Sequence, residues 1–166
     1  MENVEIKLAF RKYQYDELTE QEQRLVDMAR EATFRSYAPY SKFHVGAAVL
    51  LENGETVIGC NQENAAYPVT LCAERVAMFS SQAQYPNEPI VMLAVAARNV
   101  NDEFTQQPCS PCGSCRQVMI EHECKSGKPI KVLMVGEDGI LVTDTAKTLL
   151  PLSFVDSDMG GGMIND

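Results

Sequence analysis

The chain has 166 residues, of which 45% are hydrophobic and 22% are charged, so its length and composition are those of an ordinary globular domain with one core. Its formal net charge of −9 argues against a nucleic-acid partner, because phosphate backbones are bound by basic faces. No apolar run approaches the roughly 20 residues of a membrane helix, and no basic stretch followed by an apolar one marks a secretory signal, so we expect no membrane partner and a cytoplasmic protein.

The first 37 residues are predicted to form an N-terminal extension and a first helix. Residues 4–10 alternate roughly between apolar and polar side chains, as an edge strand does. Thr19 and Glu22 fit a capping box, and apolar residues then follow at near-helical spacing, which predicts a helix over residues 20–37. Pro39 is expected to end this helix.

The middle of the chain is predicted to contain a hairpin, a helix and a buried strand. Asn53 and Gly54 form a strong turn signal between two strands, residues 43–51 and 55–60. After a loop, residues 71–84 are predicted to be helical. Residues 90–97 are continuously apolar, which is typical of a central strand that is covered on both faces.

The last third of the chain is predicted to hold a helix over residues 112–123, strands over 130–135 and 140–143, and a short helix over 145–150. Three consecutive glycines indicate a loose tail over residues 160–166. The sequence has no internal repeat and no linker, so we expect a single domain over residues 1–166. The alternation of strands and helices predicts an α/β fold with a mixed sheet and helices on both faces.

Two cysteine motifs are the strongest chemical signal of the chain. Cys112-Gly-Ser-Cys115 follows Pro111, and Cys72 lies two residues before Glu74, each motif at the predicted start of a helix. The partial positive charge of a helix start favours thiolates, and residues three apart share one face of a helix. Catalytic zinc sites use three protein ligands and leave one position for water. Three thiolates beside a carboxylate that is not a ligand therefore predict a hydrolytic zinc site.

Other interpretations of these residues stay open. Cys112 and Cys115 alone also fit a thioredoxin-like redox pair or a structural zinc site. Arg75 is a candidate to donate hydrogen bonds to the thiolates and withdraw charge from them, Arg116 is a second candidate, and either is also explained as a surface charge. The remaining cysteines have no assigned role, although one of them, Cys109, lies near the cluster and is expected to be a free thiol: Cys60, Cys109 and Cys124. His44 and His122 are expected to be structural or surface residues.

Five sequence blocks, in order along the chain, resemble the small, all-cysteine cytidine deaminases of nucleoside salvage. They are residues 40–48 (YSKFHVGAA), 59–68 (GCNQENAAYP), 72–75 (CAER), 111–117 (PCGSCRQ) and 149–154 (LLPLSF). The resemblance implies a three-layer α/β/α fold with a five-stranded sheet, and a homotetramer in which neighbouring subunits complete each site. It also implies a hydrolase that binds one Zn²⁺ per subunit and converts cytidine and deoxycytidine to uridine and deoxyuridine with release of ammonia, as part of pyrimidine salvage.

The same resemblance assigns roles to individual residues. Glu74 would be the catalytic proton shuttle, and the metal ligands would be Cys72, Cys112 and Cys115. The supporting role of Arg75 rests on the chemistry of three thiolates given above, not on the resemblance. The implied contacts with the nucleoside substrate are Phe43, Asn61, Glu63, Ala65, Tyr67, Ala73 and Phe154. Asn61 and Glu63 alternate along the chain, so both side chains would face the sugar hydroxyls. Phe43 and Phe154 would flank the pyrimidine, although both also fit as core residues.

Two other functions remain possible at this point. The first is deamination of another aminopyrimidine, such as an aminoacyl-nucleoside antibiotic of the blasticidin type, because those enzymes share the zinc blocks. The second is a zinc-stabilised binding or regulatory protein, although the presence of Glu74 argues against a purely structural metal site. The chain also departs from the family pattern in its N-terminal extension and in an enlarged loop over residues 101–107.

Overall fold

The computed structural model describes residues 1–160, and its centre is one mixed sheet of six strands. The strand order is β1-β6-β5-β4-β2-β3, in which β4 and β5 are parallel and the other neighbouring pairs are antiparallel. The strands are β1 (Arg11–Tyr13), β2 (His44–Leu51), β3 (Thr56–Cys60), β4 (Ile90–Arg98), β5 (Lys131–Met134) and β6 (Ile140–Thr143). The predicted α/β fold with a mixed sheet is confirmed, but the sheet has six strands rather than five, because β1 is added at the edge beside β6.

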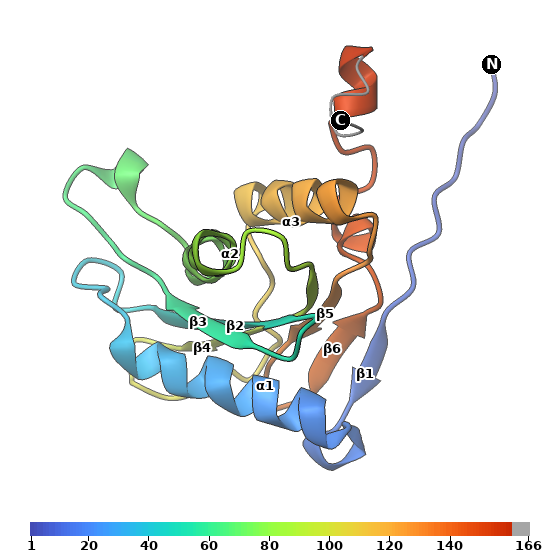
Figure 1. The fold of residues 1–166 in the computed structure, drawn as a ribbon. Coiled ribbons are helices and arrows are strands. Elements are labelled where there is room, and N and C mark those ends of the chain that lie inside the picture. Colours follow the sequence, from blue (N-terminus) through green and yellow to red (C-terminus); the bar gives the residue numbers. More distant parts are fainter. Residues whose placement is uncertain (161–166) are drawn as a thin grey trace.

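Helices cover both faces of the sheet and produce three layers (Figure 1). Helix α1 (Glu20–Ala32) packs on one face, and α2 (Ala73–Gln84) and α3 (Gly113–Ser126) pack on the other. The core under α1 includes Leu25, Val26 and Ala29, and the core under α2 and α3 includes Met78, Met119 and Ile120. The central strand β4 is buried along nearly its whole length, as its apolar run predicts.

Helix α1 begins as the sequence predicts but ends earlier. The capping box is confirmed, because Glu22 N donates to Thr19 Oγ1 at 3.3 Å and Thr19 N donates to Glu22 Oε2 at 2.9 Å. The predicted extent to residue 37 is wrong, since α1 ends at Ala32 and a 3₁₀ turn, Thr33–Arg35, follows. Arg98 of β4 explains the change, because its Nε donates to Thr33 Oγ1 at 3.0 Å and its Nη2 donates to Thr33 O at 3.2 Å. A tertiary partner therefore binds the backbone where the helix was expected to continue.

Four further 3₁₀ turns connect the elements: Tyr15–Glu17, Tyr67–Val69, Ala146–Leu149 and Asp156–Met159. The short helix predicted over residues 145–150 is the third of these turns. Gly160 ends the last turn with a left-handed φ of 71°, and the rest of the predicted loose tail, residues 161–166, lies outside the described residues. Within residues 1–160, no helix is both long enough and apolar enough to cross a membrane.

A close contact between β3 and α2 sets the position of the second helix. A Cβ atom on Gly59 would lie 2.4 Å from Ala73 O and 2.4 Å from Ala77 N. Only a residue without a side chain lets the helix lie directly on the strand at this point. The N-terminal end of α2, which begins directly after Cys72, is thereby held against the sheet.

The segment predicted as an edge strand, residues 4–10, has no strand beside it within the described part of the chain. The strand forms instead at β1, where Arg11 pairs with Val142 and Tyr13 pairs with Ile140 of β6. The residues before β1 run away from the body as an extended arm (Figure 1).

Candidate active site

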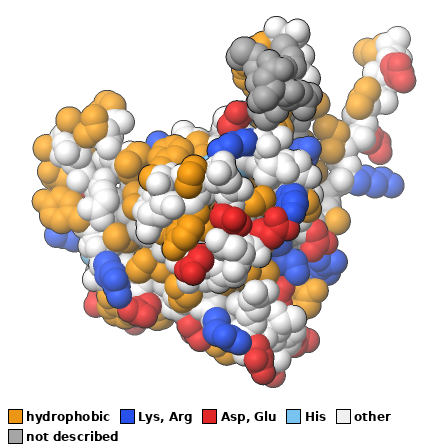
Figure 2. All heavy atoms as spheres, viewed as in Figure 1, with side chains coloured by type: hydrophobic (Ala, Val, Ile, Leu, Met, Phe, Trp, Pro, Cys, Tyr) orange, Lys and Arg blue, Asp and Glu red, His pale blue; other side chains and the backbone are white. Residues whose placement is uncertain are grey.

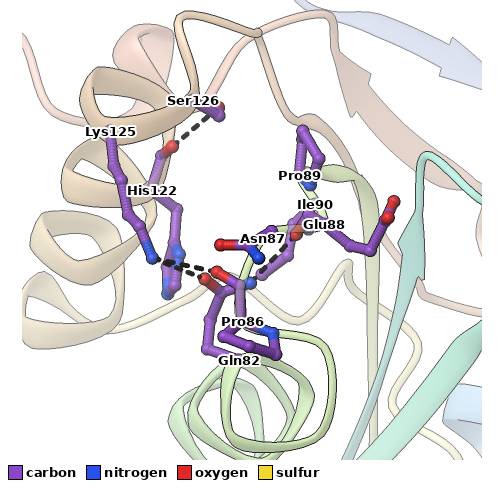
Figure 3. Close-up of a pocket in the computed structure, with 9 residues that line it drawn as sticks. All are labelled: Gln82, Pro86, Asn87, Glu88, Pro89, Ile90, His122, Lys125 and Ser126. Atoms are coloured by element: carbon purple, nitrogen blue, oxygen red, sulfur yellow. Dashed lines mark hydrogen bonds between the residues drawn. The ribbon is translucent and has the colours of Figure 1, made fainter.

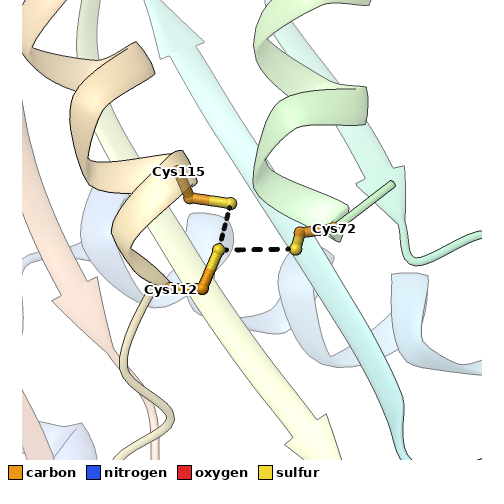
Figure 4. A group of neighbouring side chains, drawn as sticks. All are labelled: Cys72, Cys112 and Cys115. Atoms are coloured by element: carbon orange, nitrogen blue, oxygen red, sulfur yellow. Dashed lines mark hydrogen bonds between the residues drawn. The ribbon is translucent and has the colours of Figure 1, made fainter. Parts of the chain in front are cut away.

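Three cysteine sulfurs meet where α2 and α3 begin (Figure 4). Cys72 is the N-cap of α2, Cys112 is the N-cap of α3, and Cys115 lies on the first turn of α3. The Sγ atom of Cys112 lies 3.6 Å from that of Cys72 and 3.5 Å from that of Cys115. Zn–S bonds of about 2.3 Å in a tetrahedral arrangement separate two sulfurs by about 3.8 Å, so the three side chains fit a zinc ion.

These three thiols are the one group of three or more His, Cys, Asp or Glu side chains within residues 1–160 whose ligand atoms are close enough to share a metal ion. Hydrogen bonding with Cys115, followed by the Arg75 guanidinium, lowers the pKa of the Cys72 thiol to about 5. The hydrogen bond to Cys72, together with burial, raises the pKa of Cys115. A divalent cation is the kind of group that stabilises all three sulfurs as thiolates at once.

Arg75 lies directly behind the thiol cluster. Its Nη2 donates to Cys72 Sγ at 3.6 Å and to Thr70 O at 3.4 Å, and its buried Nε has no hydrogen-bond partner among the described residues. The guanidinium of Arg116 binds backbone carbonyls instead of a thiol. Its Nε donates to Pro111 O at 2.8 Å, and its Nη1 donates to Leu149 O at 2.8 Å. Of the two candidate arginines, Arg75 is therefore the one that contacts a sulfur of the thiol cluster.

Glu74 lies beside the thiols, on the first turn of α2, and lines a cavity of about 230 Å³. Its side chain is almost completely buried, and this burial raises the pKa of its carboxyl to about 7. A carboxyl that gains and loses a proton near neutral pH suits general acid–base chemistry. The other residues that line the cavity are Phe43, Val45, Asn61, Glu63, Thr70, Leu71, Cys72, Cys109, Ser110 and Cys112.

Five of the eleven residues that line this cavity were not assigned from the sequence. The unassigned residues are Val45, Thr70, Leu71, Cys109 and Ser110, and the one signal that could have found them is that each lies within three residues of a predicted site residue. The Cys109 thiol lies outside the three-sulfur cluster, and burial raises its pKa to about 12, so it remains a neutral thiol in the cavity wall.

The structure uses Asn61 to hold the start of β2. Its Nδ2 donates to Phe43 O at 2.9 Å, and its Oδ1 accepts a hydrogen bond from Val45 N at 2.8 Å. The amide therefore fixes the backbone on both sides of His44 and places Phe43 at the cavity. One Nδ2 proton is left for a further acceptor.

Glu63 lies where this cavity meets a second hollow of about 430 Å³, which is also lined by Tyr40, Ser41, Tyr67 and Thr70. Its Oε2 accepts hydrogen bonds from Tyr40 N at 2.9 Å and from Ser41 N at 3.2 Å. Hydrogen bonding from Ser41, together with the backbone N–H of Tyr40, lowers the pKa of the Glu63 carboxyl. A fixed, ionised acceptor thus stands at the junction of the two hollows.

The remaining predicted contacts do not line the cavity beside the thiols. Tyr67 is 70% exposed and packs edge-on against Tyr40, with 5.9 Å between ring centroids. Phe154 is 59% exposed and lines neither hollow, and Gln117 Nε2 of α3 donates to its carbonyl at 2.7 Å. Ala65 is exposed and Ala73 is buried, and neither of them lines the two hollows.

A third hollow, of about 300 Å³, lies between the C-terminal ends of α2 and α3 (Figure 3). His122 lies there, and burial lowers its pKa to about 4. Lys125 Nζ crosses the hollow and donates to Gln82 Oε1 at 3.1 Å and to Pro86 O at 3.3 Å. The other histidine, His44, shares a hydrogen bond with Ser36 Oγ. Neither histidine belongs to the thiol cluster.

Comparison with known proteins points to one family. The family model of the cytidine and deoxycytidylate deaminase zinc-binding region matches residues 19–127. A cytidine deaminase of Halalkalibacterium halodurans is 39% identical over 137 residues, which are 82% of this chain and 96% of that protein. The crystal structure of a cytidine deaminase from Burkholderia pseudomallei superposes with a TM-score of 0.69 at 39% identity, covering 82% of this chain and 100% of the other.

A protein named for a different substrate is also similar to this chain. A blasticidin-S deaminase of Bacillus cereus is 29% identical over 139 residues, which are 82% of this chain and 94% of that protein. The shared region in the family model begins at residue 19, so the arm and β1 precede it.

Proposed function

The chain belongs to the cytidine and deoxycytidylate deaminase family, and on that premise we propose that it hydrolyses cytidine and deoxycytidine to uridine and deoxyuridine, with release of ammonia. The observation that carries this proposal is the position of the buried Glu74 carboxyl beside a three-thiol cluster, in the wall of one cavity. Cys72, Cys112 and Cys115 would hold one zinc ion per subunit. Bound there, zinc supplies a Lewis acid that activates water for attack.

Glu74 moves the protons of the reaction. Its carboxylate takes a proton from the attacking water and delivers it to N3 of the pyrimidine, which makes C4 open to attack. The same carboxylate then takes the proton of the new C4 hydroxyl and passes it to the exocyclic amine, which leaves as ammonia while the C4 carbonyl forms. The pKa of about 7 supports both roles, because the group is a usable base and a usable acid at neutral pH. Arg75, through its hydrogen bond to Cys72 Sγ, withdraws negative charge from the ligand set.

The cavity walls bind and orient the nucleoside. The ionised Glu63 and the free Nδ2 proton of Asn61 suit the hydroxyls of a sugar, whose loss in an analogue leaves these polar groups unpaired. Phe43 packs against the pyrimidine from the cavity wall, and Phe154, which lines neither hollow of its own subunit, would cover the pyrimidine of a neighbouring subunit in the homotetramer proposed below. Tyr67, Ala65 and Ala73 complete the contacts.

Substitution of Glu74 by Gln is the direct test. The amide keeps the shape of the side chain but neither accepts nor releases the proton, so we expect zinc content to stay at one per subunit and kcat to fall by about 10²–10⁴-fold. Glu121→Gln, on the exposed face of α3, is the matched control and should retain full activity. A Glu74→Gln enzyme with near-normal turnover would refute the assignment of the proton shuttle.

Deamination of an aminoacyl-pyrimidine of the blasticidin type is the second candidate activity, because a relative of that name covers most of the chain. Steady-state rates on cytidine, deoxycytidine and blasticidin S separate the two. Higher kcat/KM for cytidine supports the first candidate, and activity on blasticidin S alone supports the second.

We also propose a homotetramer that works on free nucleosides in pyrimidine salvage in the cytoplasm. Several large apolar side chains are exposed, among them Tyr67, Phe79 and Phe154, and such surfaces are typical of subunit interfaces. All six cysteines are free thiols, and a thiolate zinc site needs a reducing compartment. Light scattering that gives the mass of one chain at micromolar concentration would contradict the tetramer.

A further inference from the structure

The N-terminal arm, residues 4–10, presents an apolar face that the rest of the described chain does not cover. Its even-numbered residues are apolar, and Val4, Ile6, Leu8 and Phe10 are 83%, 51%, 47% and 39% exposed. The arm stands away from the body, with hydrophobic and charged side chains along it (Figure 2). Alternation of this kind belongs to a strand with one buried face.

The sheet of the same chain cannot cover the arm. Arg11 pairs with Val142 in β6, so in the same register Phe10 would lie opposite Thr143, where β6 ends. Residues 4–9 therefore extend beyond the sheet, and their backbone N–H and C=O groups have no strand to pair with within residues 1–160. An extended segment with free backbone groups on a sheet edge is a template for another strand.

The geometry points to a second copy of this chain as the partner, with two arms paired as antiparallel strands about a twofold axis at Ile6. A twofold interface brings the same segment of both copies together, so the segment must complement itself. With Ile6 opposite the partner's Ile6, Val4 lies opposite the partner's Leu8. All of these apolar side chains then share one face, as a paired strand requires.

The charges of the arm select this register. In the Ile6 register, Glu5 lies opposite the partner's Lys7, and this pair occurs twice. A register centred on Lys7 would place the two lysines opposite each other, which is destabilising. A register centred on Leu8 would place Val4 opposite the partner's Lys12. It would also place Glu5 opposite the partner's Arg11, which already forms an ion pair with Asp144 of its own chain.

The overall charge argues against a polyanionic partner, and the local charge of the arm lets a second copy approach at this point. The protein has a formal net charge of −9, so it repels nucleic acids and anionic membranes. Residues 1–13 carry more cations than anions, since Lys7, Arg11 and Lys12 outnumber Glu2 and Glu5. The arms are thus a place where two acidic copies approach each other with little repulsion.

A charge-swap series in the full-length protein tests the pairing. Sedimentation velocity over a concentration series gives the association constant of the wild type and of Glu5→Lys, Lys7→Glu and the double variant. Each single substitution places like charges opposite each other twice, so we expect association about tenfold weaker. The double variant restores both pairs and should return to the wild-type association constant. None of these residues lies near the thiol cluster, so deaminase activity measured at a concentration where every variant is assembled should stay unchanged.

Deletion of residues 2–10, which leaves β1 in place, is the second variant. It should weaken association by at least about tenfold and leave the circular dichroism spectrum unchanged. Association that is unaffected by the deletion, or a double variant as weak as the single ones, overturns the proposal. A deletion that lowers only the thermal midpoint, with no change in association, also overturns it, because the arm would then cover its own chain.

Discussion

Glu123 is a buried carboxylate that joins three segments, and its removal gives a quantitative test of the fold. Ile130 N and Ala146 N both donate to its Oε1 at 2.7 Å, and Thr145 Oγ1 lies 2.9 Å from both carboxylate oxygens. Ile130 and Ala146 are completely buried, so water cannot replace the lost acceptor. Glu123 therefore fixes the starts of β5 and of the Ala146–Leu149 turn against α3.

Glu123→Ala would leave two buried N–H groups without an acceptor. Each such group costs about 1–3 kcal/mol, so we expect the free energy of unfolding to fall by about 2–6 kcal/mol. Glu123→Gln keeps an oxygen near the two N–H groups but loses the charge, and its expected cost is about 1–2 kcal/mol. Urea unfolding followed by far-ultraviolet circular dichroism measures both values.

Glu121→Ala is the matched control, because Glu121 lies on the exposed face of the same helix and should change stability by less than about 0.5 kcal/mol. The reasoning fails if Glu123→Ala is no less stable than this control. It also fails if Glu123→Gln costs as much as Glu123→Ala, because the hydrogen bonds to Oε1 would then not be the source of the stability.

Three further outcomes follow from the site and its supports. Removal of zinc by a chelator should make three more thiols reactive toward an aromatic disulfide reagent and should lower the midpoint of thermal unfolding. An unchanged number of reactive thiols would contradict a ligand set of three cysteines. Gly59→Ala should lower the free energy of unfolding in urea by at least about 3 kcal/mol, because its Cβ would collide with the α2 backbone. Gly113→Ala, which has open space around it, is the control and should change this free energy by less than about 1 kcal/mol. Equal effects of the two substitutions would refute the contact. Asn61→Ala should raise KM for cytidine and lower stability by about 2 kcal/mol, because it removes both hydrogen bonds to the start of β2, and an unchanged KM would separate Asn61 from substrate binding.

The chemistry of the site was largely accessible from the sequence because it depends on short-range spacing. Cys112 and Cys115 meet because they lie at and just after the cap of one helix, and Glu74 follows Cys72 on the first turn of another. The distance of 3.6 Å between the Sγ atoms of Cys72 and Cys112 does not follow from short-range spacing. It depends on how α2 and α3 pack on one face of the sheet. The family resemblance, rather than the spacing, supplied that step.

Other features depend on partners that are remote in sequence. The end of α1 is set by Arg98, which lies 65 residues beyond Thr33. The first strand forms at residues 11–13 rather than 4–10 because β6, its partner, is only four residues long. Phe79 fits the apolar periodicity of a core helix and yet is exposed, because periodicity alone does not say which neighbours a side chain receives. Asn61 matched a binding motif, and its hydrogen bonds to β2 became visible only in three dimensions.

The first two turns of α3 carry more than two cysteines of the thiol cluster. Arg116 and Gln117 follow Cys115, and their side chains donate hydrogen bonds to the backbone carbonyls of Leu149 and Phe154. The thiol cluster and the C-terminal segment are therefore both attached to α3, and we expect a displacement of one to shift the other. A fluorescent label placed shortly after Phe154 would accordingly act as a reporter of metal occupancy, without any probe in the catalytic cavity itself.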